Sequence, residues 1–235
     1  GGEGGGVVRV LAERPLRSGL IATVVMSEIL DGDLAVDDPD GELDRRRSAV
    51  VPRPWSWLRQ VHGVKVVVVS TPGDCAGSEA DASVTTRAGC PLGVQVADCA
   101  PVALLADGGG IAVVHVGWRG LRDGVLDAAA RALGRIAEGP QRAVVGPCIH
   151  PCCYEFGEAD LDVLVGGFGS AVRQRTMDGR PSLDLPAAVG VALGRFGVDD
   201  VWVDGACTGC DPRYWSFRVS GRPQRQAMVA WLQWP

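Results

Sequence analysis

Runs of aliphatic and β-branched residues recur along the chain and predict a series of short strands. The valine-rich run 64–69 predicts a buried strand. The segment Asp107–Gly110 separates two apolar runs and is typical of a β-hairpin. Loose alternation over residues 7–25 ends in another strand candidate. Strands are therefore expected at residues 20–25, 64–69, 93–97, 102–105, 111–116, 142–145 and 201–203.

Apolar residues at the helical period predict helices between these strands. From Leu121 to Ile136 they return every three or four positions and form one face, and Gly139-Pro140 ends that helix. Further helices are expected over residues 159–165, 186–196 and 224–232, the last closing the chain. Interleaved helices, strands and hairpins favour an α/β fold with a mixed sheet over a purely parallel one.

Composition places the chain among ordinary globular proteins. Of its 235 residues, 46% are hydrophobic and 22% are charged. We expect a flexible glycine-rich tail at residues 1–6 and one domain over residues 7–235. The formal net charge of −5 argues against general binding to nucleic acid or to an anionic membrane. Residues 31–47 change from acidic to basic and predict a solvated loop that leads into a short helix.

The cellular setting is inferred from what the sequence lacks. No secretory signal pattern and no run of about 18 apolar residues is present. The eight cysteines are therefore expected to be reduced thiols, and we expect a cytoplasmic protein. The sequence leaves the oligomeric state open, with a slight preference for a monomer.

Potential ligands gather in three short segments beside predicted strands. The segments are Gln60-Val61-His62-Gly63, Ala97-Asp98-Cys99-Ala100-Pro101 and His115-Val116-Gly117-Trp118-Arg119-Gly120. Two imidazoles and one thiolate form a three-ligand zinc set whose fourth position stays open. Cys99 and His115 could instead act as a nucleophile and its base. The spacing leaves both hypotheses open, together with a purely structural role for these residues.

Other charged residues near these segments suggest further roles. Arg119 stands where the strand meets the long helix, and a guanidinium beside a helix N-terminus favours an anion such as phosphate. Asp81 and Asp98 are candidate proton carriers, with loop or turn capping as the alternative.

The remaining cysteines allow several interpretations. Cys207 and Cys210 have the spacing of a zinc or redox pair. Cys148 and Cys152 could complete a four-ligand structural site with His150. Free thiols without a ligand role are the favoured interpretation from the sequence.

More short motifs follow the ligand segments in a distinctive order. They are Glu79-Ala80-Asp81-Ala82, Val84-Thr85, Gly146-Pro147-Cys148-Ile149, Tyr154-Glu155-Phe156-Gly157, Leu183-Asp184-Leu185, Cys207-Thr208 and Ser216-Phe217-Arg218. Together with the three ligand segments, this order resembles the YfiH-like laccase-domain family from about residue 42 to the C-terminus. Members of that family are also described as multicopper polyphenol oxidoreductases or purine nucleoside phosphorylases. The resemblance implies an α/β sandwich.

The resemblance also implies roles for particular residues. His62, Cys99 and His115 match the family's metal ligands, which are described as holding zinc, or copper where oxidase activity is claimed. Arg119 matches a residue that would contact substrate or phosphate. The other candidates for substrate or phosphate contacts are Gln60, Arg46 and Arg218.

Four functions compete at this stage. The leading hypothesis is a zinc-dependent purine nucleoside enzyme. It would carry out phosphorolysis of adenosine or inosine, with 5′-methylthioadenosine as a further candidate, adenosine deamination by zinc-activated water, or both. Its partners would be a small-molecule nucleoside and phosphate.

The other three hypotheses use the same residues differently. A copper polyphenol oxidase is disfavoured because three histidines cannot supply a type-1 centre and a trinuclear cluster. A Cys99–His115 amide hydrolase that edits peptidoglycan precursors is the third hypothesis, because such a role is attributed to bacterial relatives. The fourth is a binding module without catalysis, in which the ligand segments do not converge.

Overall fold

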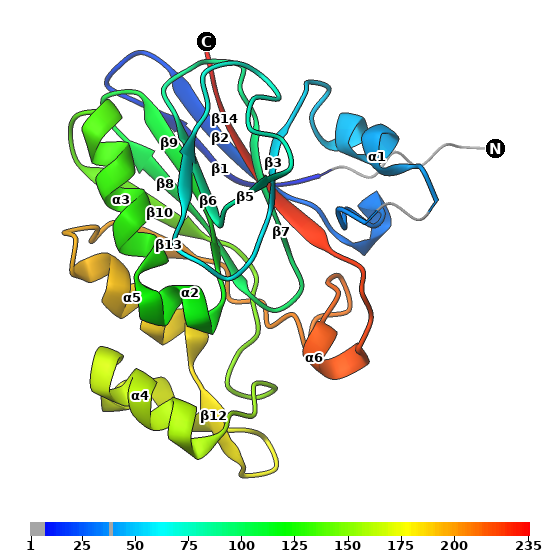
Figure 1. The fold of residues 1–235 in the computed structure, drawn as a ribbon, viewed down its shortest axis with the longest axis vertical. Helices are drawn as coiled ribbons and strands as arrows, with labels where there is room; N and C mark the ends of the chain where they lie inside the picture. Colours follow the sequence, from blue (N-terminus) through cyan, green and yellow to red (C-terminus); the bar gives the residue numbers. More distant parts are fainter. Residues whose placement is uncertain (1–7, 38–39) are drawn as a thin grey trace.

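Two β-sheets form the centre of the structure (Figure 1). The computed structural model describes residues 8–37 and 40–235, so the tail predicted at residues 1–6 lies outside the described residues. In spatial order, the first sheet contains β1 (Arg9–Pro15), β2 (Ile21–Met26), β14 (Gln226–Gln233), β7 (Leu92–Val96), β3 (Ser56–Arg59) and β5 (Ser78–Glu79). The second contains β13 (Val201–Val203), β10 (Gln141–Val145), β8 (Ala100–Ala106), β9 (Gly110–Val116), β6 (Ala82–Thr85) and β4 (Val66–Val68).

Both sheets mix parallel and antiparallel pairs. β3 runs parallel to β7 and β5 in the first sheet, and β10–β13 and β4–β6 are the parallel pairs of the second. β8 and β9 pair antiparallel from Ala100↔Val116 to Ala106↔Gly110, so the hairpin predicted at Asp107–Gly110 is present. The predicted mixed α/β fold is therefore confirmed. A separate small sheet pairs β11 (Arg173–Arg175) with β12 (Pro181–Leu183).

Helices cover the outer face of the second sheet (Figure 1). α3 packs across β6, β8 and β9, and α5 packs beside α3. The α-helices are α1 (Leu43–Val50), α2 (Trp118–Asp123), α3 (Val125–Ile136), α4 (Glu158–Phe168), α5 (Leu185–Gly194) and α6 (Phe217–Ser220), and two 3₁₀ turns lie at Ile29–Asp31 and Ser170–Val172. α1 follows the acidic segment, as the charge pattern predicts.

Strand β8 shows why the centre of the sandwich is continuously apolar. Its side chains alternate between the two faces of the second sheet. Val102 and Leu104 face the helices, whereas Ala103 and Leu105 face the first sheet. Because both faces are covered, all seven residues of β8 are buried. A smaller apolar cluster on the far side of the first sheet packs Val25 and Val229 against the region of α1.

The helix predicted over residues 224–232 is wrong, because this segment is strand β14. It pairs antiparallel with β2 on one side and with β7 on the other. Met228 faces the core between the sheets, and Val229 faces the opposite apolar cluster. A strand that is buried on both faces has no polar alternation, so its apolar run is easily taken for a helix.

The single helix predicted from Leu121 to Ile136 is also corrected. The structure begins a helix earlier, at Trp118, and breaks it at Gly124. Gly124 has φ 96° and ψ 33°, and its N–H donates to the carbonyl groups of Gly120 and Leu121. This left-handed cap ends α2 and starts α3 in a new direction.

The valine-rich run 64–69 forms less strand than expected. The strand itself comprises only Val66–Val68, as the edge strand β4 beside β6. Val64 is 41% exposed and Val68 is 53% exposed, whereas Val69 is buried. The prediction of a buried strand is therefore wrong for most of the run, because an edge strand has one uncovered side.

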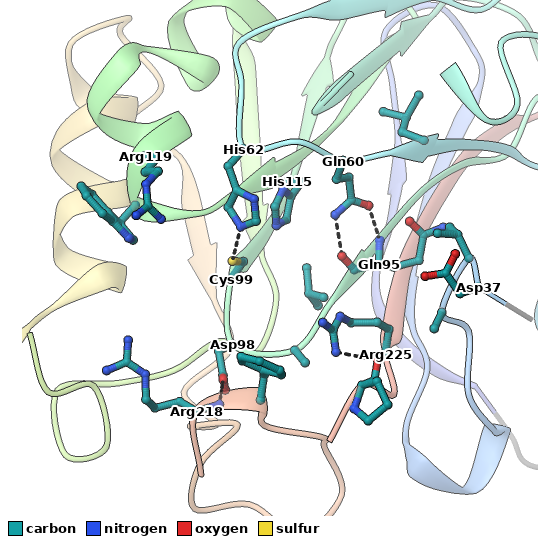
Figure 2. A pocket seen from close by; sticks show the side chains of 18 of the residues that line it. Asp37, Gln60, His62, Gln95, Asp98, Cys99, His115, Arg119, Arg218 and Arg225 are labelled. Atoms are coloured by element: carbon teal, nitrogen blue, oxygen red, sulfur yellow. Dashed lines mark hydrogen bonds between the residues drawn. The ribbon is translucent and has the colours of Figure 1, made fainter. Parts of the chain in front are cut away.

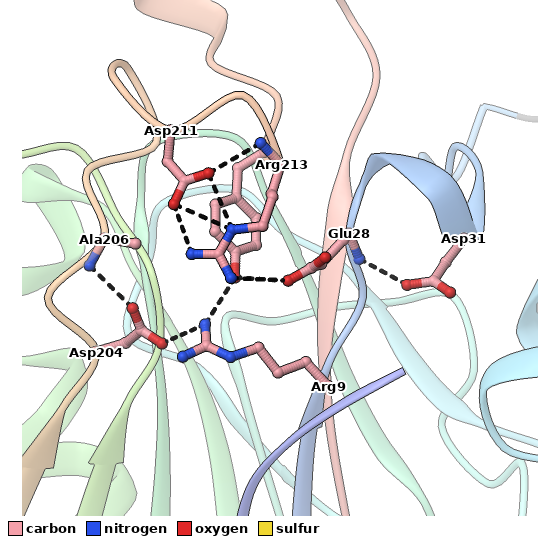
Figure 3. Close-up of polar contacts among 8 residues, drawn as sticks. Arg9, Glu28, Asp31, Asp204, Ala206, Asp211 and Arg213 are labelled. Atoms are coloured by element: carbon pink, nitrogen blue, oxygen red, sulfur yellow. Dashed lines mark hydrogen bonds and ion pairs between the residues drawn. The ribbon is translucent and has the colours of Figure 1, made fainter. Parts of the chain in front are cut away.

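A polar network joins the N-terminal strand to the segment that follows β13 (Figure 3). Arg9 pairs with the buried carboxylate of Asp204 at 2.6 Å and donates to the Tyr214 hydroxyl at 2.9 Å. Arg213 pairs with Glu28 at 3.3 Å. These contacts tie the segment after the second sheet's edge strand β13 to β1 and to the end of β2. Among the described helices, none has the length and apolar character needed to cross a membrane.

The break between α2 and α3 leads to a stability prediction. Gly124→Ala places a side chain on a residue with φ 96°, so the free energy of unfolding should fall by about 1–2 kcal/mol. The matched control is Gly134→Ala inside α3, where the new Cβ would lie at an ordinary 3.5 Å from Gln141 Nε2. That variant should gain about 0.5–1 kcal/mol. Urea unfolding of both variants measures the difference, and shifts of the same sign would contradict the assignment of the break.

Candidate functional site

Three potential ligands from separate parts of the chain converge at one end of the sandwich. His62 lies in the loop between β3 and β4, Cys99 in the turn between β7 and β8, and His115 in β9. Their ligand atoms all lie within 4.8 Å of one another. His62 Nε2 is 3.8 Å from Cys99 Sγ, and the two imidazole rings meet edge to face at 4.8 Å. The structure therefore brings together the three segments singled out in the sequence.

The turn that carries Cys99 connects the two sheets, because β7 belongs to the first and β8 to the second. Asp98 within it has φ 91°, a costly conformation for a residue other than glycine. Three contacts hold Asp98 there. Its carboxylate accepts hydrogen bonds from the Thr208 hydroxyl and the Arg218 N–H, each at 2.7 Å, and its carbonyl accepts one from Ile149 N–H at 2.9 Å. Asp98 therefore positions the Cys99 turn, and its carboxylate is already engaged.

Asp81 lies directly behind the two histidines and is fully buried. Its carboxylate is 2.8 Å from His115 Nδ1 and accepts backbone N–H bonds from Val61, His62 and Gly63 at 2.7 to 3.2 Å. A carboxylate behind a ligating imidazole fixes the ring and directs the other ring nitrogen to the metal. Because Asp81 does not line the cavity described below, its geometry favours a positioning role over the predicted role as proton carrier.

The buried charges of the site stabilise one another. Burial opposes a thiolate at Cys99, yet the positive His115 ring and hydrogen bonds from both histidines lower the Cys99 pKa to about 6. Burial also opposes a charged ring at His115, but Cys99 and Asp81 raise its pKa to about 9. Burial alone would raise the pKa of Asp81, and its hydrogen bonds from His115 and Gly63 bring it below the usual value. At neutral pH the metal-free pair is therefore a thiolate and an imidazolium.

Gly117 lets the three ligands approach so closely. A Cβ at this position would lie 2.5 Å from His62 Cδ2 and 3.2 Å from Cys99 Sγ. Since real Cβ atoms do not come within 3 Å of a ring carbon, any side chain here would displace His62. The glycine after His115 and Val116 is thus part of the ligand arrangement.

A cavity of about 510 Å³ opens beside the three ligands (Figure 2). This volume lies in the range of small-molecule sites. In the view of Figure 2, Arg119 and Arg218 lie to one side of Cys99, and Arg225 and Asp37 lie to the other. The aromatic residues that line the cavity are Trp118, Tyr154 and Phe217.

The predicted substrate residues occupy different places. Arg119 is exposed and stacks on Trp118 at 4.4 Å, and Arg218 lies over the Tyr154 ring at 5.0 Å. Both line the cavity. Gln60 lines it too, but the Gln60 amide exchanges hydrogen bonds with the Gln95 backbone at 2.7 and 2.8 Å.

Arg46 is not brought to the cavity. Its guanidinium pairs with Asp40 at 2.5 Å and donates to the Asp33 carbonyl at 3.3 Å. This places Arg46 in the packing of α1 against the preceding acidic loop. The predicted phosphate contact of Arg46 is therefore not supported by its position.

Sequence reasoning missed several cavity residues, including Asp37, Arg225 and Phe217. Arg225 precedes β14, in the segment interpreted as a helix, so its direction could not be predicted. The acidic segment that contains Asp37 carried no signal beyond its charge. Phe217 lies within the Ser216-Phe217-Arg218 motif, in which the charge of Arg218 is the stronger indication of a ligand contact.

Comparison with known proteins identifies similar chains. The model of a protein family described as multi-copper polyphenol oxidoreductase laccase matches residues 28–233. A Streptomyces coelicolor protein named purine nucleoside phosphorylase is 36% identical over 226 residues, which cover 92% of this chain and 93% of that protein. A Pseudomonas aeruginosa protein with the same name is 37% identical over 235 residues, covering 96% and 94% of the two chains.

Solved structures show the same fold. A Neisseria meningitidis protein assigned to the DUF152 family superposes with a TM-score of 0.81 at 26% identity, covering 96% of this chain and 99% of its own. Bacillus licheniformis YfiH gives a TM-score of 0.78 at 20% identity and covers 91% and 93% of the two chains. The expected YfiH-like α/β sandwich is thereby confirmed.

The thiolate–imidazolium pair predicts an unusual pH dependence for alkylation of Cys99 in metal-free protein. Because only the thiolate reacts, the rate of iodoacetamide labelling should rise through a midpoint near pH 6. Removing the positive ring in His115→Ala should move this midpoint upward, toward the ordinary thiol value of about 8.5. Peptide-resolved mass spectrometry follows Cys99, and Cys75, whose pKa burial raises, is the internal control. A wild-type midpoint in the ordinary thiol range would refute the ion pair.

Proposed function

We propose that this chain, which belongs to the family described as multi-copper polyphenol oxidoreductase laccase, is a zinc-dependent purine nucleoside phosphorylase. The family resemblance inferred from the ordered motifs is confirmed, and relatives named purine nucleoside phosphorylase support an enzymatic role. The observation that carries the proposal is the position of the His62–Cys99–His115 set on the wall of a cavity that also presents Arg119 and Arg218.

The three ligands fit a single zinc ion. Two imidazoles and a thiolate are a normal catalytic zinc set, and all three line the cavity, so the remaining position would face a bound molecule. Asp81 supplies the carboxylate that orients His115. When bound, the ion supplies Lewis acidity beside the cavity. The same ligands would also hold copper tightly, so the resident metal must be measured.

The chain's own residues account for the other requirements of phosphorolysis. Arg119 and Arg218 would hold inorganic phosphate through charge-assisted hydrogen bonds. The half-exposed ring of Phe217 offers a stacking surface for a purine. A phosphate oxygen then bonds to the anomeric carbon while the bond to the base breaks, and the proton that phosphate gives up passes to the base. From adenosine or inosine the products are the free purine and ribose 1-phosphate; from 5′-methylthioadenosine they would be adenine and 5-methylthioribose 1-phosphate. Adenosine, inosine and 5′-methylthioadenosine are the candidate substrates, and adenosine deamination at the same cavity is a second candidate reaction.

A cysteine hydrolase is the second candidate function, and one observation favours it. Cys99, His115 and Asp81 stand in the order of a nucleophile, a base and an orienting carboxylate, and the His115 ring lowers the pKa of Cys99 to about 6. An amide would replace the nucleoside as substrate.

The copper oxidase has weaker support. His62 and His115 are at the site, whereas the backbone N–H of the third histidine, His150, contacts Cys207 in a separate loop. The described histidines therefore do not gather into a multinuclear copper centre.

The proposal extends to the location, the domain organisation and the oligomeric state of the protein. We propose a cytoplasmic location, supported by eight cysteines that are all free thiols. One domain is supported by the apolar core that the two sheets share. A monomer remains our expectation.

Product analysis separates these functions. The purified protein is analysed for metals and then incubated with adenosine or inosine, with and without phosphate. Release of the base that requires phosphate, and that stops after chelation, is the expected result. Inosine formed from adenosine without phosphate would assign deamination. No nucleoside turnover by zinc-loaded protein would reject the proposal and favour Cys99 as a hydrolytic nucleophile.

The arginine side chains give a sharper test of the phosphate site. Arg119→Ala should raise the KM for phosphate about 10- to 100-fold, because a hydrogen bond to a charged group contributes about 1.5–3 kcal/mol. Its effect on the KM for the nucleoside should be much smaller. Arg222→Ala is the control, since it removes an exposed charge beside Pro223 but does not line the cavity. Equal effects of the two substitutions would show that Arg119 contributes only long-range charge.

A further inference from the structure

Four cysteine thiols gather at a second place, outside the cavity. Cys152 and Cys153 come from the loop after β10, and Cys207 and Cys210 from the turn after β13. Their sulfur atoms all lie within 4.8 Å of one another. The Cys153–Cys210 distance is 3.3 Å, and Cys152 is 3.6 Å from both Cys207 and Cys210.

These sulfur–sulfur distances are similar to those around one tetrahedrally coordinated metal ion. Zinc–sulfur bonds of about 2.3 Å place the sulfurs of a tetrahedron about 3.8 Å apart. A disulfide needs a bond of about 2.05 Å and pairs each sulfur with one partner, whereas Cys152 and Cys210 each have two thiol neighbours. We propose that Cys152, Cys153, Cys207 and Cys210 bind a second, structural zinc ion.

The backbone around the cluster is built for this close approach. Cys210 N–H and Asp211 N–H both donate to the Cys207 carbonyl, at 3.0 and 2.8 Å, which closes the turn between the two cysteines. Gly209 lies in that turn, and a Cβ there would be 2.8 Å from Cys153 Cβ. The His150 N–H donates to Cys207 Sγ at 3.4 Å. A backbone donor aimed at a sulfur stabilises the thiolate that zinc requires.

The position of the cluster in the fold explains how the two loops meet. β10 and β13 are parallel neighbours, so the segments that leave their ends emerge side by side. A bridge between Cys148 and Cys207 extends this pairing, and Thr208 N–H donates to the Cys148 carbonyl at 3.0 Å. The structure thus selects Cys153 as a ligand and leaves Cys148 in the core, outside the cluster.

The charge and the ligand number indicate a structural role. Four thiolates and one zinc ion carry a net charge of −2. Arg218 lines the same surface depression as Cys152 and Cys153, whereas Arg180 in that depression is already paired with Glu155 and Asp178. All four coordination positions would be filled by protein, and none of the four cysteines lines the substrate cavity. A closed tetrathiolate site of this kind stabilises structure and leaves no position for substrate.

The cluster also supports the Cys99 turn. Thr208, between the two cysteines of the turn, donates to the Asp98 carboxylate at 2.7 Å. Ile149, from the other loop, donates to the Asp98 carbonyl at 2.9 Å. A zinc ion that joins these loops would therefore hold both contacts to Asp98 in place.

Metal analysis of the full chain tests this proposal. In Cys99→Ser, which removes the thiolate of the cavity site, one zinc per chain should remain. Its X-ray absorption spectrum should show a first shell of sulfur only, at about 2.3 Å. Cys207→Ser and Cys210→Ser should each contain one zinc less than wild type and unfold at a lower temperature. Cys75→Ser is the control, because Cys75 lies outside both ligand sets, and it should keep the wild-type zinc content.

The results that would overturn the four-cysteine site differ from those that would count against a metal at the cavity. The proposal would be overturned if the Cys99→Ser variant contained no zinc, or if it contained iron in place of zinc. Disulfides within the cluster, found in protein purified without reductant, would also overturn it. Cys99→Ser decides the matter even if the Cys207 and Cys210 variants fail to fold. Wild-type protein with a single all-sulfur zinc would support the cluster and count only against the metal at His62, Cys99 and His115.

Discussion

The Asp81 carboxylate is buried where strand β6 begins, and four hydrogen bonds satisfy it. Pairing of Ala82 with Val114 in the second sheet brings Asp81 beside His115. The same carboxylate holds the loop of His62 through three backbone N–H groups. A charge buried this deeply is stable only when it is fully paired, so loss of any partner would disturb both histidines. The geometry of the candidate metal site thus depends on the register of two strands and one buried charge.

Asp98 positions the turn of Cys99, as Asp81 positions the two histidines, but the partners of Asp98 come from late in the sequence. Thr208 and Arg218 reach it from segments more than 100 residues away. The turn with φ 91° is maintained by these contacts and not by its own preference. Both acidic residues that the sequence suggests for proton transfer therefore make contacts that hold the candidate ligands in position. The groups with displaced pKa values that line the cavity are then Cys99, His115 and Tyr154, whose pKa is raised by burial.

The sequence predicts most of the fold and the three residues that the structure brings together as a candidate metal site, and its failures have physical reasons. The hairpin β8–β9 and the candidate ligands His62, Cys99 and His115 follow from local patterns and from the order of motifs. Strand β14 could not be recognised, because a strand covered on both faces lacks alternation. Arg225 was missed for the same reason. The charge of Arg46 suggests a phosphate contact, whereas its partner in the structure is Asp40, because the acidic loop folds back on α1.

The cysteines show what spacing can and cannot reveal. The Cys207–Cys210 spacing suggests a ligand pair, but the sequence does not say which residues of the loop at 147–153 face it. The register of β10 against β13 decides this, because it brings Cys148 into a backbone bridge with Cys207 and leaves Cys152 and Cys153 facing Cys210. The two candidate ligand sets differ in their donor atoms and in their surroundings. A mixed nitrogen and sulfur set beside a cavity leaves room for substrate, whereas four sulfurs between two loops close the site. Asp98 touches both regions, so the order of the closed site and the position of Cys99 are linked through one turn.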